Sequence, residues 1–242
     1  MRVVSLVPSV TETLLALGAE VVACTRFCEQ PGLRTVGGTK DPDVEAILAL
    51  RPDLVVMNDE ENRRADAEAL AAAGLPVHDC SPRSVAEVGP AVRALAARLA
   101  LEVPEAFREG PWAAWLARHP EQPARRPVFV PVWRRPWITG NDDTYGASLL
   151  ARCGLRNVFG DAPDRYPRVA LAEVADRRPA LVLLPSEPYP FRARHAREIT
   201  AALPGVPVRF VDGRDLFWWG IRTPPALARL RNLLAEGAGP DR

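Results

Sequence analysis

Short runs of consecutive apolar residues alternate along this chain with segments in which apolar residues recur at three- and four-residue steps. In the first part of the chain we expect strands at residues 3–7, 21–25, 54–57 and 76–80. The helical segments expected between them run from Ser9 or Thr11 to Gly18, from Pro42 to Leu50, and over 62–73. Ser9 or Thr11 is the expected cap of the first helix. Strands that alternate with helices in this way predict βαβ units and a mainly parallel sheet.

The middle of the chain has a helical pattern without strands. Apolar residues recur at helical spacing from Ser84 to about Leu101 and again from Pro104 to about His119. Gly110 and Pro111 are expected to kink the second of these helices.

The pattern of strands and helices then returns. Strands are expected at 128–133, 181–185 and 208–212. Helices are expected at about 143–153, 171–177, 192–202 and 224–234. The second half thus repeats the first, and the sequence predicts an α/β fold: two Rossmann-like lobes with mainly parallel sheets, joined by a rigid helical segment. The expected parts are an N-terminal lobe (1–82), a helical connector (83–126) and a C-terminal lobe (127–242), with a ligand cleft between the lobes.

The loops that follow the expected strands hold an unusual number of large aromatic residues. Four of the six tryptophans, Trp133, Trp137, Trp218 and Trp219, fall in two such loops. Each ring either fills space between loops and helices or meets a ligand, because an exposed indole in a polar loop costs solubility. Companion loops add Phe27, Tyr145, Tyr189, Phe191 and Phe217. A cluster of this size favours a ligand surface, and its flat rings suit a macrocycle or an aromatic chelate.

Composition narrows the class of partner. Hydrophobic residues make up 48% and charged residues 25% of the 242, which is typical of a folded globular protein. The formal net charge of +1 predicts neither nucleic-acid binding nor attraction to an anionic membrane.

The first residues show no signal peptide, and no segment approaches the length of a membrane span. We therefore expect a cytoplasmic protein as written, or a periplasmic or cell-surface one if the N-terminus is truncated.

Other chemistry is possible at a few positions. Cys24, Cys28, His78 and Cys80 end two strands and are a candidate metal set, although CxxxC and HxC match no common zinc module. The loop acids, Asp59, Glu60 and Glu61 with Asn141, Asp142 and Asp143, are an alternative divalent-ion set; loop solubility and helix capping explain them equally simply. His119 and His195 are expected on helix surfaces. The chain contains no GxGxxG after a strand, no phosphate loop and no GxSxG, so we expect no catalytic residues, no metal and no intrinsic cofactor.

Four segments carry a resemblance to a known class of proteins. RVVSLVPSVTETLLALGAE, VEAILALRPDLVV, ASLLARCGLRNVF and LAEVADRRPALVLL resemble ABC-transporter substrate-binding proteins of the helical-backbone class, which carry cobalamin, iron siderophores or haem. NDEENRRAD, VWRRPWITG and LPSEPYPF are most similar to the cobalamin-binding members. The resemblance implies a noncatalytic, monomeric, two-lobed receptor that closes little on its ligand, a cobalamin-like corrinoid.

The expected ligand-binding residues are Phe27, Glu61, Trp133, Arg135, Trp137, Tyr145, Tyr189, Phe217, Trp218 and Trp219. A ferric-siderophore or haem receptor is the alternative, and for it Arg26, Arg63, Arg134, Arg135 and Arg222 are the candidate cations. A two-lobed transferase or lyase is the alternative of another class.

The resemblance also implies a membrane permease as partner, docked through one acidic residue on each lobe. Here Arg64 falls near the first-lobe position, with Glu60, Glu61 and Asp66 close by, and Glu187 is the candidate on the second lobe. Docking to a permease therefore stays open, as does a role in corrinoid handling.

Overall fold

The computed structural model describes residues 1–123 and 125–235, which form two compact units. The N-terminal unit consists of Met1–Pro82, Ala86–Trp115 and Trp218–Ile221. The C-terminal unit consists of Arg83–Val85, Leu116–Phe217 and the described chain from Arg222 onward.

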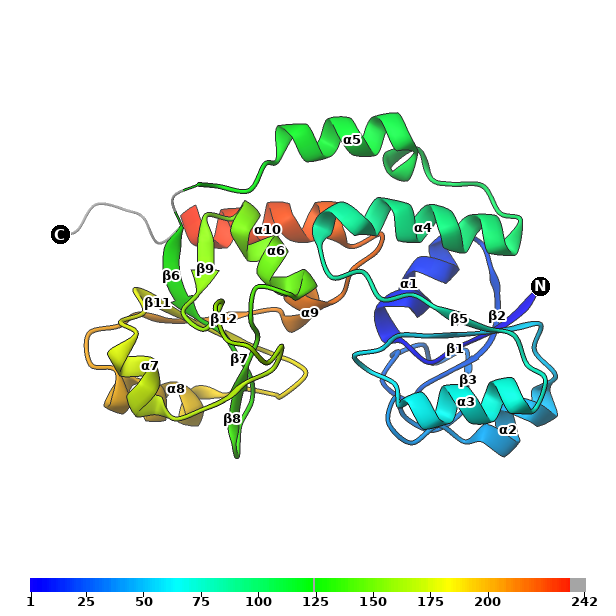
Figure 1. The fold of residues 1–242 in the computed structure, drawn as a ribbon, viewed down its shortest axis with the longest axis horizontal. Helices are drawn as coiled ribbons and strands as arrows, with labels where there is room; N and C mark the ends of the chain where they lie inside the picture. Colours follow the sequence, from blue (N-terminus) through cyan, green and yellow to red (C-terminus); the bar gives the residue numbers. More distant parts are fainter. Residues whose placement is uncertain (124, 236–242) are drawn as a thin grey trace. The chain divides into compact units, whose positions relative to one another are not determined.

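The N-terminal unit is built on a five-stranded parallel sheet of order β3-β2-β1-β4-β5 (Figure 1). Its strands are β1 (Arg2–Ser5), β2 (Glu20–Cys24), β3 (Arg34–Thr35), β4 (Leu54–Met57) and β5 (Val77–Asp79). The four expected strands are confirmed. β3 was not expected, because it is two residues long and both of its side chains are exposed.

Three short helices connect these strands: α1 (Pro8–Ala16), α2 (Val44–Leu50) and α3 (Arg64–Ala72). The cap of α2 is Asp43, whose carboxylate accepts a hydrogen bond from the Ala46 N–H at 2.9 Å. The expected cap of α1 was wrong. Pro8 occupies the first helical position, where no N–H is needed, so the helix starts before Ser9 and Thr11. The Thr11 hydroxyl instead donates back to the Val7 carbonyl at 3.0 Å.

The helical middle of the chain contains α4 (Val85–Leu99), the single 3₁₀ turn η1 (Glu105–Phe107) and α5 (Glu109–Arg118). The helix expected from Pro104 to His119 is therefore shorter than predicted. Pro111 lies in the first turn of α5, where its missing N–H costs nothing, so Gly110 and Pro111 begin this helix rather than kink it.

A proline inside α4 explains how the two helices meet. Pro90 has no N–H to donate to the carbonyl of Ala86, one helical turn before it. That carbonyl instead accepts a hydrogen bond from the Trp112 indole of α5 at 3.3 Å. Gly89 leaves the space for the indole, because a Cβ atom at this position would overlap the Trp112 ring.

The C-terminal unit contains two sheets. The first is parallel, of order β12-β11-β6-β9. Its strands are β6 (Arg126–Phe129), β9 (Leu155–Asn157), β11 (Leu181–Pro185) and β12 (Val208–Val211). The second is antiparallel, of order β10-β8-β7, with β7 (Pro131–Trp133), β8 (Trp137–Thr139) and β10 (Arg168–Val169). The single strand expected at 128–133 is thus divided at Val130 between the two sheets.

The helices of this unit are α6 (Tyr145–Arg152), α7 (Leu171–Asp176), α8 (Ala193–Ala202), α9 (Gly213–Phe217) and α10 (Thr223–Ala235). All but α9 were expected. Figure 1 shows α7 and α8 side by side on one face of the parallel sheet. Val174 and Ile199 of these helices pack there on Phe129, Val182 and Leu184 of the strands. The observed fold is α/β with mainly parallel sheets, as the sequence predicts.

Candidate functional site

An aromatic cluster joins the β7–β8 hairpin to the loop that follows β11. Its members are Trp133, Trp137, Tyr189, Phe191 and His195. The Trp137 ring stacks on Phe191 with centroids 5.9 Å apart and an angle of 3° between planes. Trp133 meets Tyr189 edge to face at 5.4 Å, and Tyr189 lies 4.8 Å from Phe191. All five residues belong to the C-terminal unit.

Exposure rises across this cluster from one side to the other. Phe191 is part of the hydrophobic core, and Trp137 and Tyr189 pack against that core while partly exposed. Trp133 exposes 44% of its surface. The cluster therefore presents one rigidly supported indole to solvent, which is the arrangement that a flat apolar ligand needs.

A pocket of 330 Å³ adjoins the cluster. Its lining consists of Arg134, Arg135, Tyr189, Arg194, His195 and Glu198. The hairpin turn supplies the first two, and Arg135 has a positive φ of 69°. The first two turns of α8 supply the last three.

One ion pair joins two residues of this lining, Arg134 and Glu198. Both Nε and Nη2 of Arg134 contact the same carboxylate oxygen of Glu198, at 2.8 and 2.6 Å. The Arg134 guanidinium also lies 5.7 Å from the centre of the Trp137 ring. These contacts fix the hairpin against α8.

His195 was expected on a helix surface, and that expectation was wrong, since the residue is only 2% exposed. It is the third residue of α8, and its Nδ1 accepts a hydrogen bond from the Arg192 N–H at 2.9 Å, so the ring turns back to cap its own helix. Burial lowers the pKa of His195, and the neighbouring Arg194 and Arg134 lower it further. The imidazole is therefore neutral at pH 7, with its proton on Nε2, 3.4 Å from the Tyr189 hydroxyl.

The structure places the other expected ligand residues in several environments. Trp218 and Trp219 are 8% and 4% exposed and belong to the N-terminal unit, although they follow strands of the second half. Phe27 is half-exposed, with the Arg26 guanidinium 4.8 Å from its ring centre. The backbone N–H of the half-buried Glu61 donates to the Asn58 side chain.

Tyr145 and Phe217 lie within the C-terminal unit. The buried Tyr145 hydroxyl is 3.0 Å from that of Thr223, and burial raises its pKa. Phe217 is half-buried beside Gly146. Of the ten expected residues, the structure brings Trp133, Arg135, Trp137 and Tyr189 together at one place. The ligand-binding role of the ten stays a prediction.

Three residues that line the pocket were not expected, namely Arg194, His195 and Glu198. The expected ligand residues all came from segments near strand ends, and His195 was expected only as a surface residue of a helix. The missed signal is the position of α8: a helix that starts just after a strand-end loop places its first turns beside that loop.

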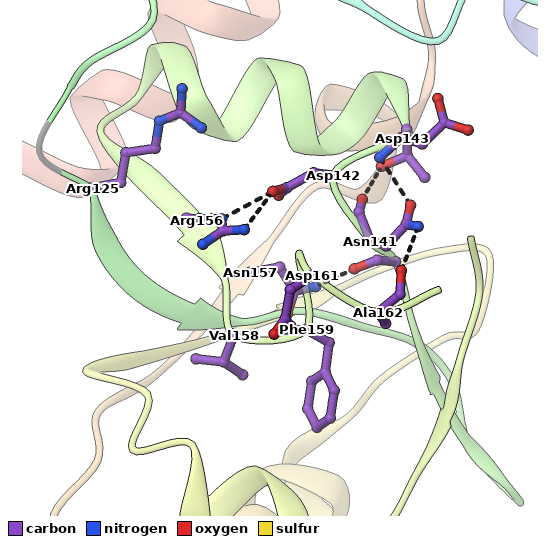
Figure 2. Close-up of polar contacts among 12 residues, drawn as sticks. Arg125, Asn141, Asp142, Asp143, Arg156, Asn157, Val158, Phe159, Asp161 and Ala162 are labelled. Atoms are coloured by element: carbon purple, nitrogen blue, oxygen red, sulfur yellow. Dashed lines mark hydrogen bonds and ion pairs between the residues drawn. The ribbon is translucent and has the colours of Figure 1, made fainter. Parts of the chain in front are cut away.

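The candidate divalent-ion loop is occupied by its own protein contacts (Figure 2). Arg156 donates to Asp142 at 2.8 and 3.0 Å, and Asp143 pairs with Arg83 at 3.1 Å. The Asn141 carboxamide accepts from the Asp143 N–H and donates to the Ala162 carbonyl. These contacts explain the loop by hydrogen bonding and ion pairing.

Two of the candidate metal ligands, Cys24 and Cys28, contact each other within the N-terminal unit. Cys28 Sγ lies 3.2 Å from the hydroxyls of both Thr11 and Thr25. A hydrogen bond from Cys24 lowers the pKa of the Cys28 thiol, and the same contact raises the pKa of Cys24. Across the residues that the structure describes, no three His, Cys, Asp or Glu side chains are grouped to hold a metal ion.

Comparison with known proteins decides the family. The model of the family described as periplasmic binding protein matches residues 3–194. The chain belongs to this family. The resemblance noted in the sequence is thereby confirmed, and a binding protein rather than an enzyme is the class that the family shows.

Relatives with known names cover most of the chain. A vitamin B12-binding protein of Pectobacterium carotovorum is 26% identical over 198 residues, 77% of this chain and 72% of the relative. One of Yersinia pestis is 28% identical over 194 residues, 76% of this chain and 69% of the relative.

Solved structures share the fold. The periplasmic vitamin B12 binding protein BtuF of Vibrio cholerae superposes with a TM-score of 0.77 at 21% identity, covering 99% of this chain and 98% of that one. The periplasmic heme-binding protein BhuT, in complex with two hemes, also gives 0.77, at 23% identity, with 97% and 98% covered. Within the described residues, no helix is both long and apolar enough to span a membrane.

Proposed function

We propose that this protein is a noncatalytic receptor for a cobalamin-like corrinoid, with haem as the second candidate. Its relatives in sequence are named for vitamin B12, and its structural neighbours for vitamin B12 and for haem. The observation that carries the proposal is the half-exposed Trp133 indole, held edge to face by Tyr189. A planar macrocycle laid on this ring buries apolar area on both partners.

The ferric-siderophore alternative loses support from the pairing of its candidate cations. Four of the five arginines are paired with carboxylates: Arg26 with Asp41 at 3.0 Å, Arg63 with Asp66 at 3.1 Å, Arg134 with Glu198 at 2.6 Å and Arg222 with Asp215 at 3.4 Å. An anionic iron chelate needs several cations that no carboxylate neutralises. Of this set, only Arg135 meets that condition.

Haem is retained as second candidate for a specific reason. Arg135 lies in the pocket beside Tyr189, and haem carries two carboxylates on a flat ring whereas cobalamin carries mostly amides.

An uptake role, with delivery of the ligand to a membrane permease, is part of the proposal. Glu187, 3.8 Å from Arg214, remains the candidate docking residue of the second half.

The experiment is an absorbance titration of the purified protein with cyanocobalamin, haem and a ferric hydroxamate in parallel. Equilibrium dialysis against each ligand gives the stoichiometry. The proposal expects saturable binding of cyanocobalamin, with quenching of tryptophan fluorescence. Saturable binding of haem alone would replace the first candidate with the second. Binding of the ferric chelate alone, or of none of the three, would contradict the proposal.

A further inference from the structure

The pocket beside the aromatic cluster has a composition that a flat apolar ligand does not explain. Its six lining residues include three arginines and one glutamate. His195 is neutral for the reasons given above, so the lining carries two more positive charges than negative ones. We propose that this pocket is an oxyanion site, which binds a carboxylate or phosphate group through Arg135, Arg194 and Tyr189.

The pairing of Arg134 with Glu198 leaves the other two arginines as the binding cations. Within the described residues the structure gives Arg135 no hydrogen bond and no ion pair, although it lines a pocket. Guanidinium groups bind carboxylate and phosphate oxygens with two parallel hydrogen bonds, which makes arginine well suited to such a group.

Arg194 lacks a satisfactory partner for a different reason. Its Nε lies 3.1 Å from His195 Nε2, while the Arg192 N–H donates to His195 Nδ1 at 2.9 Å. A neutral imidazole has one acceptor nitrogen, so it accepts from only one of these two donors. The backbone donor is fixed at the start of α8, so the exposed Arg194 guanidinium is the donor left without an acceptor.

Tyr189 supplies the third donor. The protonated Nε2 of His195 faces the Tyr189 hydroxyl oxygen at 3.4 Å, so that oxygen acts as acceptor toward the imidazole. The hydroxyl proton is then available to the pocket. A neutral donor in the same lining as two cations completes a set of donors for an oxyanion, and the volume of 330 Å³ exceeds that of a phosphate.

The same oxyanion chemistry has two sources, a free anion or a carboxylate on the macrocyclic ligand. The first arm of the test uses free anions. Inorganic phosphate and succinate are titrated into the wild-type protein by calorimetry, with intrinsic tryptophan fluorescence as a second readout. The variants are Arg135→Gln and Arg194→Gln, whose exposed side chains are replaceable without loss of the fold; thermal melting checks this. Arg197→Gln is the matched control, because it is an exposed arginine of the same helix that does not line the pocket.

One charge-assisted hydrogen bond corresponds to roughly a tenfold change in affinity or more. We expect each pocket variant to weaken binding by at least about that factor and the control to leave it unchanged. A loss of the same size in Arg197→Gln would show nonspecific attraction and overturn the proposal.

The second arm compares haem with haem dimethyl ester, whose carboxylates are blocked. If the anion belongs to the macrocycle, wild type prefers haem and Arg135→Gln loses the preference. If the anion is free, haem and its ester behave alike while phosphate still binds. Absence of both phosphate binding and a haem preference would refute the oxyanion site. Failure of the tetrapyrrole proposal is distinguishable, since phosphate would bind while neither macrocycle does.

Discussion

Two indoles of one hairpin are expected to respond oppositely to truncation. Trp137 stacks on the core residue Phe191, whereas Trp133 exposes 44% of its surface. Replacing a fully buried Trp with Ala costs about 3 to 5 kcal/mol, of which a stacked pair accounts for about 0.5 to 1.5 kcal/mol. Because Trp137 is only partly buried, we expect Trp137→Ala to lower the free energy of unfolding by about 2 to 3 kcal/mol. Trp133→Ala should cost about 1 kcal/mol or less.

Ligand affinity should show the reverse order. A macrocycle that covers Trp133 loses the ring contact and its buried area in Trp133→Ala. The expected loss of binding free energy is about 2 kcal/mol, which corresponds to a dissociation constant about thirtyfold larger. Urea denaturation followed by circular dichroism gives the stability of each variant, and a cyanocobalamin or haem titration gives the affinity. Unchanged affinity in Trp133→Ala, together with a stability loss equal to that of Trp137→Ala, would refute the reasoning. Both rings would then be core residues.

Three further substitutions test other parts of the structure. Gly89→Ala should destabilise the protein by about 1 to 3 kcal/mol in urea denaturation, although alanine favours helix, because its Cβ overlaps the Trp112 ring; Gly110→Ala, where a Cβ meets nothing within 4 Å, is the control. Asp215→Ala should cost about 2 kcal/mol, since it removes a 4% exposed carboxylate that accepts two 2.6 Å hydrogen bonds from Arg229. The lowered pKa of His195 stabilises the fold above about pH 6.5, and this contribution is lost as pH falls. His195→Gln should therefore lose less stability than wild type between pH 7.5 and 5.5; an equal loss would contradict the assignment.

Most strands of the parallel sheets were predictable because they are apolar runs between amphipathic helices, whereas β9, which has an exposed arginine at its centre, was not expected. Leu54–Met57 and Leu181–Pro185 are buried at every position. Such continuous apolar runs are typical of strands in a sheet that is covered on both faces. Strands that fail this test were missed. Arg34–Thr35 is polar and exposed, and Arg168–Val169 is two residues long, so neither carries a periodic signal.

The candidate site was predictable only in part. The segments after β6 and β11 were expected to lie together, because strand-end segments meet at one sheet edge, and the structure does bring Trp133, Trp137 and Tyr189 into one aromatic cluster. The contribution of α8 to the site was not predictable, since the residues around His195 in the sequence do not distinguish it from a surface histidine. The cap that it makes to Arg192 turns its ring toward Tyr189 and Phe191, and where the helix starts is not evident from the pattern.

The N-terminal unit is not encoded by one continuous stretch of chain. It includes Trp218–Ile221, and the Ile221 N–H lies 3.4 Å from the Thr13 hydroxyl, 208 residues earlier. Gly220, with a φ of 107°, lies against the same threonine, where a Cβ atom would overlap the hydroxyl. During synthesis this unit therefore stays incomplete until residues 218–221, which follow the long segment Leu116–Phe217 of the C-terminal unit, have left the ribosome. A fragment that ends after α5 therefore lacks two buried tryptophans that belong to its own unit, Trp218 and Trp219.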